Sequence, residues 1–224
     1  MIEFEGVEFD FGDGPVLHGI ALTLAPASMT VVVGPPGAGK TTFVRLCLRD
    51  LDPTAGAIRF FGQRAPSGRN AVAALRRRIG VVPQAPVFID HLSLRDNIAL
   101  PLRAGGAAAG DRLEDLRALL DWVELGDRAG AWPEALSAEE RQRAALARAV
   151  ILSPEVIVAD EPGSGGDAGS AERLVERLLE LHGMGKTVLV ATREPAICRL
   201  ARDRAGAELV ALVDGRMTAV EPSA

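Results

Sequence analysis

The chain has 224 residues, of which 48% are hydrophobic and 25% charged, and this composition excludes an intrinsically disordered protein. A formal net charge of −5 provides no global basic field, so we expect neither nucleic acid nor an anionic membrane surface as a direct partner. Because no apolar run approaches the roughly 18 residues of a membrane span, we expect any membrane association to come through a partner protein.

Seven segments have the composition of β-strands, and several of them are continuous apolar runs. Such runs are typical of strands that are buried on both faces of a sheet covered by helices, and they favour an α/β fold. Asp214-Gly215 is a strong hairpin signal and predicts an antiparallel pair near the end of the chain. In chain order the predicted strands are residues 2–9, 29–34, 57–61, 79–83, 156–160, 187–192 and 208–213.

Six segments are predicted to be helical: residues 41–49, 69–78, 112–124, 137–152, 171–182 and 196–202. Between Gln84 and Pro154 no strand is expected, although strands flank this region on both sides. We therefore expect a helical lobe, residues 85–154, inserted into an α/β core formed by residues 1–84 and 155–224. The Gly/Ala-rich stretch 104–111 is expected to be a loop within this lobe. Cys47 and Cys198 fall in predicted helices and are expected to be buried thiols in a reducing cytosol.

A glycine-rich stretch, GPPGAGKT at residues 34–41, lies between a predicted strand and a predicted helix. This context is what distinguishes a phosphate-binding loop from a connecting turn that merely matches GxxxxGK[ST]. Its backbone N–H groups turn toward phosphate oxygens, Lys40 reaches the β and γ phosphates, and the Thr41 hydroxyl ligates Mg²⁺. We therefore expect the nucleotide to be bound by Gly34, Pro35, Pro36, Gly37, Ala38, Gly39, Lys40, Thr41 and Thr42.

The stretch VIVADEP, residues 156–162, is an apolar strand that ends in two acids. A carboxylate at the tip of such a strand, here Asp160, is expected to hold the Mg²⁺ shell. Its neighbour Glu161 is expected to orient or deprotonate an attacking water. Acidic pairs at strand ends are common, but together with the phosphate loop this pair predicts a site for ATP and Mg²⁺.

These motifs resemble those of the ATP-binding subunits of ABC transporters, and the resemblance runs nearly end to end. VVPQ places Gln84 where this family has its Q-loop, and residues 136–162 match the signature helix and the acidic strand that follows it. The resemblance implies a P-loop NTPase of the ABC type, with a mixed-sheet core, an N-terminal antiparallel β subdomain and an inserted helical subdomain. It also implies catalytic roles for Gln84, Glu161 and Arg193, Mg²⁺ ligation by Thr41, Gln84 and Asp160, and nucleotide contacts by Ser137 and Asp167.

Two finer assignments follow from the resemblance. Phe11 stands where the family often has an aromatic residue that stacks on adenine, and the alternative is an ordinary core phenylalanine. The stretches LRRRIGVVPQ, DNIALPLRAGG and ARAVILSPEVIVADEP are most similar to the cell-division subfamily, FtsE, which is related to the lipoprotein-release and macrolide-export ATPases. Membership of that subfamily implies an FtsX-like integral membrane partner, whereas an exporter would have a permease. It also implies that this chain is cytoplasmic and is held at the inner face of the membrane by its partner. The helical lobe is expected to contact this membrane partner. Val87 and Phe88 either belong to that docking surface or are part of the core of the lobe.

The signature departs from the family pattern LSGGQ, because this chain has LSAEE at residues 136–140. Ser137 followed by Glu140 is a capping box, so a purely structural account of this change exists. Glu139, however, replaces a glycine that in the family contacts the γ phosphate bound by the opposite protomer. At about 5 Å and an effective dielectric near 20, a carboxylate repels a phosphate charge by roughly 3 kcal/mol. This predicts weakened closure on ATP.

Two further departures concern the same phosphate. Arg193 replaces the family's switch histidine, and it neutralises charge but does not shuttle a proton at neutral pH. Gly165-Gly166 in the loop that keeps Asp167 predicts a more flexible dimer contact. Glu139 and Arg193 are either a compensating pair across a dimer or independent drift. A working ATPase, a nucleotide-gated scaffold and a soluble ABC protein remain alternatives, as do a homodimer and a heterodimer.

Overall fold

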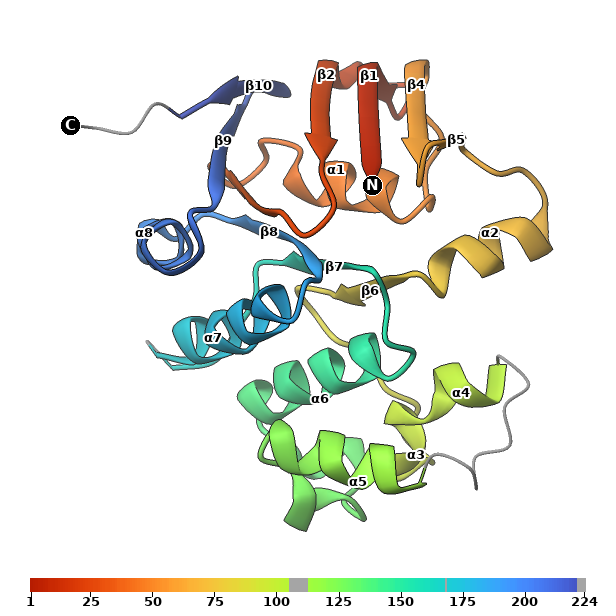
Figure 1. Cartoon of the computed structure of the whole chain (residues 1–224), viewed down its shortest axis with the longest axis vertical. Coiled ribbons are helices and arrows are strands. Elements are labelled where there is room, and N and C mark those ends of the chain that lie inside the picture. The colour runs from red at the N-terminus through yellow and green to blue at the C-terminus, as the bar shows by residue number, and fades with distance from the viewer. Residues whose placement is uncertain (105–112, 168, 221–224) are drawn as a thin grey trace.

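Two β-sheets pack on either side of one helix (Figure 1), and the computed structural model describes residues 1–104, 113–167 and 169–220. The four-stranded sheet is antiparallel and has the order β2-β1-β4-β5, with strands β1 (Ile2–Asp10), β2 (Pro15–Leu24), β4 (Ala55–Phe60) and β5 (Gln63–Arg64). The six-stranded sheet has the order β10-β9-β3-β8-β7-β6, with strands β3 (Met29–Val33), β6 (Ile79–Val82), β7 (Val156–Asp160), β8 (Thr187–Thr192), β9 (Glu208–Val213) and β10 (Arg216–Ala219).

The six-stranded sheet is parallel except for β10, and its central strands β7 and β8 are buried throughout. One hydrophobic core lies between this sheet, the antiparallel sheet and α1 (Lys40–Cys47). A second core lies on the opposite face, under α6, α7 and α8. The continuous apolar strands are therefore covered on both faces, as the sequence predicts.

All elements between β6 and β7 are helical among the described residues, and they form the lower part of the molecule in Figure 1. They are α3 (Leu94–Ile98), α4 (Leu100–Ala104), α5 (Leu113–Trp122), α6 (Ala138–Val150) and the short 3₁₀ turns η2 (Gly126–Arg128) and η3 (Pro133–Ala135). The remaining helices are α2 (Arg69–Arg76), α7 (Ser170–Gly183) and α8 (Pro195–Ala205). The expected α/β core with an inserted helical part is thus present, while the exact boundaries 85–154 stay a prediction.

The structure adds elements that the sequence patterns did not predict. Strand β2 was missed because its alternation is broken at Gly19 (φ 59°), where the ladder with β1 shifts register. Strand β5 and helices α3 and α4 are short segments of two to five residues, too short for a periodic pattern to develop. The hairpin at Asp214-Gly215 is confirmed, with φ values of 46° and 72°. Of the predicted loop 104–111, Ala104 ends α4 and the rest lies outside the described residues.

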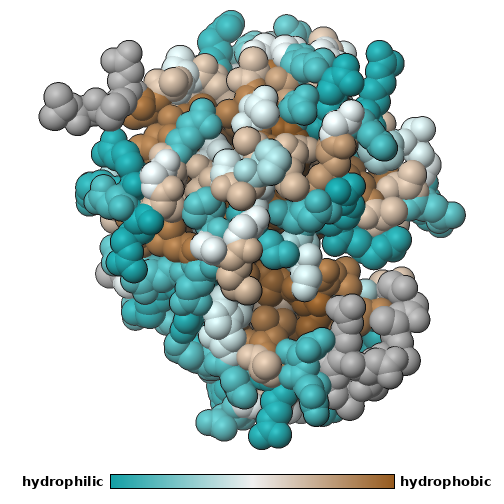
Figure 2. Space-filling view, in the orientation of Figure 1, coloured by the Kyte–Doolittle hydropathy of each residue, from teal (hydrophilic) through white to brown (hydrophobic). Residues whose placement is uncertain are grey.

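The surface in Figure 2 is mostly hydrophilic, with an apolar area between the upper and lower parts of the molecule. Among the described residues, no helix is both long enough and apolar enough to cross a membrane. Cys47 and Cys198 are buried free thiols, as predicted, and burial raises the pKa of both.

Candidate nucleotide site

The loop between β3 and α1 is shaped by glycines that the surrounding backbone requires. A side chain at Gly34 would place its Cβ 2.1 Å from the carbonyl oxygen of Leu212 on β9, so this position admits no other residue without a backbone shift. Gly39 caps α1 with a φ of 99°, a conformation that favours glycine. Strand β3 and the neighbouring β9 thus fix where this loop leaves the sheet.

The N-terminus of α1 is arranged to attract an anion. No side chain caps it, and its first turn contains no acidic residue, so the backbone N–H groups of this turn keep their positive partial charge. The loop ahead of it turns at Gly37, whose φ is 80°. Exposed N–H groups at the start of a helix, preceded by a glycine-rich turn, are a binding site for phosphate.

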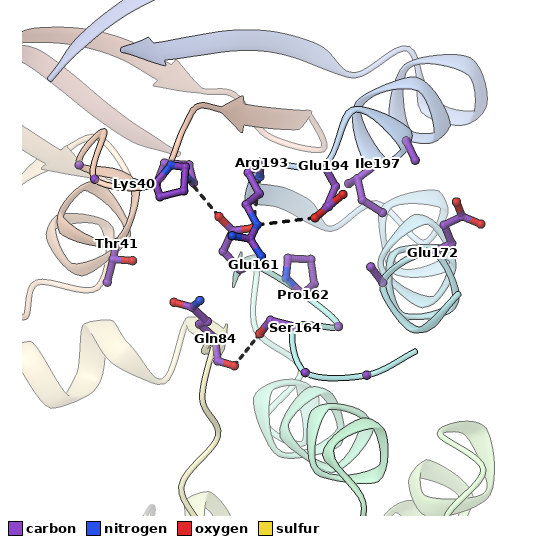
Figure 3. Close-up of a pocket in the computed structure, with 18 of the residues that line it drawn as sticks. Lys40, Thr41, Gln84, Glu161, Pro162, Ser164, Glu172, Arg193, Glu194 and Ile197 are labelled. Atoms are coloured by element: carbon purple, nitrogen blue, oxygen red, sulfur yellow. Dashed lines mark hydrogen bonds and ion pairs between the residues drawn. The ribbon is translucent and has the colours of Figure 1, made fainter. Parts of the chain in front are cut away.

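A cavity of about 650 Å³ opens next to this loop. Figure 3 shows that its side chains come from α1, from the segments that follow β6, β7 and β8, and from α7 and α8. The predicted site residues that line it are Pro36, Gly37, Gly39, Lys40, Thr41, Thr42, Gln84, Glu161, Asp167 and Arg193. Its described lining does not include Phe11, Gly34, Pro35, Ala38, Ser137 or Asp160.

Lys40 is held at the floor of this cavity by three oxygen atoms. Its Nζ donates to the carbonyl oxygens of Gly34 at 2.8 Å and Pro35 at 3.0 Å, and lies 3.1 Å from Glu161 Oε1. Glu161 has a φ of 44°, which is rare for a residue with a Cβ, and its N–H donates to Ala191 O at 2.8 Å. Backbone strain of this kind concentrates at functional sites, because the surrounding structure must enforce it.

Asp160 lies at the end of β7, is 4% exposed, and its Oδ1 has no hydrogen-bond partner among the described residues. Burial raises the pKa of this carboxyl group, while the Thr41 hydroxyl and the charge of Lys40 act in the opposite direction. A buried carboxylate oxygen without a partner needs a cation or a donor to compensate it. Thr41 and Asp160 therefore fit the ligand set of Mg²⁺, which is usually held by one or two protein oxygens together with phosphates and water.

Gln84 is exposed, and its backbone carbonyl oxygen anchors two other segments at the cavity. It accepts a hydrogen bond from Ser164 Oγ at 2.9 Å and from Gln142 Nε2 at 2.8 Å. Gln142 lies on α6, is 2% exposed, and also donates to Pro83 O at 3.3 Å. Sequence reasoning missed Gln142 as a site-forming residue, although a polar residue on the buried side of the predicted helix was a usable signal.

Arg193 lies beside Glu161 at the end of β8. Its backbone N–H donates to Glu161 Oε2 at 3.2 Å, and its Nε lies 3.6 Å from Glu194 Oε1. The Arg193 side chain is 59% exposed and lies beside Glu161 in Figure 3. The position predicted to replace the switch histidine is therefore next to the candidate catalytic acid.

The capping box predicted for α6 is present. Ser137 Oγ accepts from the Glu140 N–H at 3.1 Å, and Glu140 Oε2 accepts from the Ser137 N–H at 2.8 Å. Glu140 is also bonded to Arg128, whose Nε lies 2.9 Å from Oε1. The Arg128 hydrogen bond, followed by the Ser137 backbone, holds the pKa of Glu140 below its ordinary value.

The expectation that Glu139 acts as an uncompensated negative charge is wrong. Its carboxylate accepts hydrogen bonds from Arg173 Nε at 3.1 Å and Nη2 at 3.0 Å, and Ser170 Oγ lies 3.2 Å from its Oε2. This neighbouring positive charge weakens the phosphate repulsion that an isolated carboxylate would exert, although Arg173 is shared with Asp167. Because Glu139 and Arg193 both have partners within this chain, a pair between them across a dimer would require both partners to be exchanged.

Phe11 is not a core residue, so that alternative is wrong. Its side chain is 57% exposed, and its ring packs edge-on against Phe9 with centroids 4.7 Å apart. An exposed aromatic ring on the segment after β1 is available for stacking, and this role stays a prediction.

Comparison with known proteins identifies relatives across nearly the whole chain. The family model described as ABC transporter matches residues 17–164. The chain is 32% identical over 217 residues to the cell division ATP-binding protein FtsE of Bacillus subtilis (strain 168), covering 96% of this chain and 93% of that protein. It is 36% identical over 177 residues to the lipoprotein-releasing system ATP-binding protein LolD 1 of Rhodopirellula baltica, covering 78% and 77%. The solved dimeric structure of the ATP-binding cassette MJ0796, bound to ADP and Pi, is 26% identical with a TM-score of 0.87, covering 100% of both chains.

Proposed function

The chain belongs to the ABC transporter family, and on that premise we propose that it is the ATP-binding subunit of an ABC-type membrane complex. The family match confirms the resemblance that the motifs indicate, and the structural match confirms the P-loop fold of the ABC type. A single observation carries the proposal furthest. The buried pair Lys40 and Glu161 faces one cavity at the uncapped start of α1.

ATP is proposed to bind with its phosphates at this helix start. The backbone N–H groups of residues 37–42 and Lys40 supply donors and positive charge where the phosphate charge is highest. The exposed ring of Phe11 is the candidate stacking surface for adenine. Ser137 and Asp167 are proposed to contact nucleotide across a dimer, as the family resemblance implies.

Thr41, Asp160 and Gln84 are proposed to hold Mg²⁺ together with the phosphates. Mg²⁺ is usually held by one or two carboxylates together with substrate phosphates and water. Mg²⁺ supplies Lewis-acid polarisation of the phosphoryl oxygens when bound. Glu161 is the group placed to orient or deprotonate the attacking water.

Hydrolysis is proposed to be weakened, because Arg193 stands where a histidine could exchange a proton. The guanidinium stabilises negative charge but stays protonated, so proton transfer falls on Glu161 alone. A working ATPase of an exporter or lipoprotein-release system is the second candidate, favoured by the intact pair Lys40 and Glu161. A nucleotide-gated scaffold that binds ATP without turnover is the third, favoured by Arg193.

The proposed partner is an integral membrane protein, FtsX-like if the cell-division relationship extends to function, or otherwise a permease. Phe88 is lobe core at 7% exposure, and the Arg148 guanidinium lies 4.7 Å from its ring. Val87 is 78% exposed, so it is the apolar contact that the dock would use. A second cavity, of about 840 Å³, lies between α2, α4 and the end of α6, and it offers a recess for a partner segment.

The complex is proposed to lie on the cytoplasmic face of the membrane, with this chain paired either with itself or with a second ABC subunit. Dimerisation is supported by the dimeric state of the solved cassette described above. A heterodimer would keep one competent site even if the LSAEE signature of this chain does not support the other.

Steady-state ATP hydrolysis by the purified chain with Mg²⁺, alone and with its membrane partner in lipid, tests the proposal. Turnover that disappears in both Lys40→Ala and Glu161→Gln supports a working ATPase. Tight ATP binding without turnover above these two variants, even with the partner present, favours the scaffold. Absence of ATP binding contradicts the proposed function altogether.

A further inference from the structure

Arg173 on α7 joins the segment 162–167, which lines the nucleotide cavity, to the start of α6. Its guanidinium binds Glu139 at the start of α6 through two parallel hydrogen bonds. It also donates to Asp167 Oδ1 at 2.7 Å and to Ser170 Oγ at 3.2 Å. A fork of two N–H groups on one carboxylate fixes orientation as well as distance, which a single surface ion pair does not.

Asp167 is the end of the segment 162–167, which lines the cavity immediately after Glu161. Its carboxylate also accepts from the Gly169 N–H at 3.0 Å and from Ser170 Oγ at 2.9 Å. The segment turns tightly, because the Ser164 N–H donates to Glu161 O and the Gly166 N–H donates to Gly163 O. Contacts that hold Asp167 in place therefore also hold the segment 162–167, which follows Glu161.

Gly165 and Gly166 do not make this segment loose by themselves. A Cβ at Gly166 would lie 2.3 Å from Ser170 Oγ, so the segment packs directly on the first turn of α7. Its other attachment is the hydrogen bond from Ser164 Oγ to the Gln84 carbonyl oxygen. The segment 162–167 is therefore held from two sides: Ser164 is bonded to Gln84, and Asp167 is bonded to Arg173.

Gln84 and Arg173 are each hydrogen-bonded to a residue of α6. Gln142 of this helix holds the Gln84 carbonyl, and Glu139, one turn earlier on the helix, holds Arg173. Arg143 Nε adds a weaker contact to Glu139 at 3.9 Å. The Arg173 hydrogen bond is the main cause that lowers the pKa of Glu139, so this carboxylate is charged at neutral pH.

We propose that Arg173 is a positioning residue of the nucleotide site, which locks the segment 162–167 to α6 through Glu139 and thereby places Glu161 for reaction. The proposal rests on the proposed function, because it assumes that the cavity takes a nucleotide. The acid that replaces a signature glycine then has a use within its own chain, as the partner of Arg173. Glu139 and Arg173 act as one unit, and loss of either is expected to loosen the segment, although Asp167 still accepts from the Gly169 N–H and Ser170 Oγ.

The first measurement is amide hydrogen exchange of residues 163–167 in the full chain, for wild type, Arg173→Ala, Glu139→Gln and the double variant. Arg177→Ala is the matched control, since Arg177 lies one turn further along α7 and pairs with Glu124 and Glu180, away from the cavity. We expect exchange to rise about tenfold in Arg173→Ala, to rise in Glu139→Gln, and to rise no further in the double variant. Arg177→Ala is expected to match wild type.

The second measurement is single-turnover ATP hydrolysis with excess protein, together with the Kd for ATP. We expect Arg173→Ala to lower the rate of the chemical step about tenfold and to change the Kd less than about twofold, because the loop of residues 34–42 is untouched. Arg173→Lys keeps the positive charge but loses the paired N–H groups of the guanidinium. Its rate of the chemical step is therefore expected to lie between those of wild type and Arg173→Ala.

The outcomes separate the positioning role from the proposed function. Unchanged exchange in Arg173→Ala overturns the proposal, whatever the ATP site does. Faster exchange in Arg173→Ala with an unchanged rate of the chemical step also overturns the proposal. Arg173 would then hold the segment 162–167 in place without any effect on catalysis. If wild type fails to bind ATP, the proposed function falls, and the tether measured by exchange stands without a catalytic role.

Discussion

Lys40 Nζ and Glu161 Oε1 lie 3.1 Å apart, and both side chains are largely buried, at 6% and 13% exposure. The lysine that is expected to meet the phosphates is therefore already compensated by the acid that is expected to activate water. We therefore expect phosphate binding to be coupled to the release of Glu161 from Lys40, because the phosphates compete for the positive charge that Glu161 now neutralises.

Glu161→Gln is expected to raise ATP affinity and to abolish turnover. The amide no longer competes for Lys40 and no longer repels the γ phosphate, so the Kd for ATP is expected to fall by about tenfold. Loss of the general base is expected to lower the rate of hydrolysis by roughly 10²- to 10⁴-fold. Equilibrium binding of a fluorescent nucleotide and phosphate release check the two effects.

The matched control for that experiment is Lys40→Ala, in which the other member of the pair is lost. It leaves Glu161 uncompensated in the cavity, so the Kd is expected to rise by at least about tenfold. Equal ATP affinity in both variants would contradict the competition between Glu161 and the phosphates for Lys40.

Arg193→His is expected to make hydrolysis faster and dependent on pH. An imidazole exchanges a proton near neutral pH, with an ordinary pKa of about 6.5, whereas a guanidinium stays charged. We expect turnover of the variant to vary between pH 5.5 and 8 and that of wild type to vary less, as measured by the pH profile of kcat. Arg193→Gln, which has no titratable group, is the control, and an identical profile for all three proteins would exclude a role for proton transfer at this position.

Much of the fold could be predicted, because the features that determine it are local. The continuous apolar strands, the phosphate loop between β3 and α1, and the hairpin at Asp214-Gly215 each contain their own pattern within a few residues. Strand β2 escaped prediction because a bulge at Gly19 breaks its alternation, and the pairing with β1 that stabilises it is not visible in its own sequence.

The site was predictable in composition but not in its cross-connections. Lys40, Thr41, Gln84 and Glu161 were identified from their motifs and line one cavity. The partner of Glu139 was not found, because Arg173 lies 34 residues further along the chain in an ordinary amphipathic helix. The repulsive effect of Glu139 was therefore overestimated, because the arginine that compensates its charge is brought near only by the fold.

Asn97→Ala is expected to destabilise the helical lobe. Asn97 is fully buried on α3, where Oδ1 accepts from the Ile89 N–H at 2.7 Å and Nδ2 donates to the carbonyl oxygens of Ile89, Leu92 and Ser93. Removing the amide leaves buried backbone groups without partners, at a cost of about 2 kcal/mol. For a chain of this size we expect the Tm to fall by roughly 4 to 8 °C.

Calorimetry of Asn97→Ala beside Asp90→Asn checks this expectation, because Asp90 is an exposed position of the same segment. The control is expected to keep the wild-type Tm. Since Asn97 holds the backbone of Ile89, two residues after Val87, weaker binding of the membrane partner by Asn97→Ala at a temperature where it remains folded would add support for the dock. A Tm within 1 °C of wild type, roughly the scatter of such a measurement, would show that the lobe does not depend on these hydrogen bonds.

Glu139→Gln is expected to reduce stability at neutral pH but not in acid. The Arg173 hydrogen bond holds the pKa of Glu139 below its ordinary value of 4.5 in the folded protein. A carboxyl group whose pKa is lowered by folding stabilises the folded state above its unfolded pKa, and this contribution is lost as the pH falls through the folded pKa. Urea unfolding of wild type and Glu139→Gln should therefore differ by the same free energy from pH 8 down to about pH 5.5, and the difference should shrink below pH 4.5. Glu134→Gln, at an exposed position, controls for the loss of one negative charge. A difference between wild type and Glu139→Gln that stays constant down to pH 3 would mean that the variant acts through something other than the charge of Glu139.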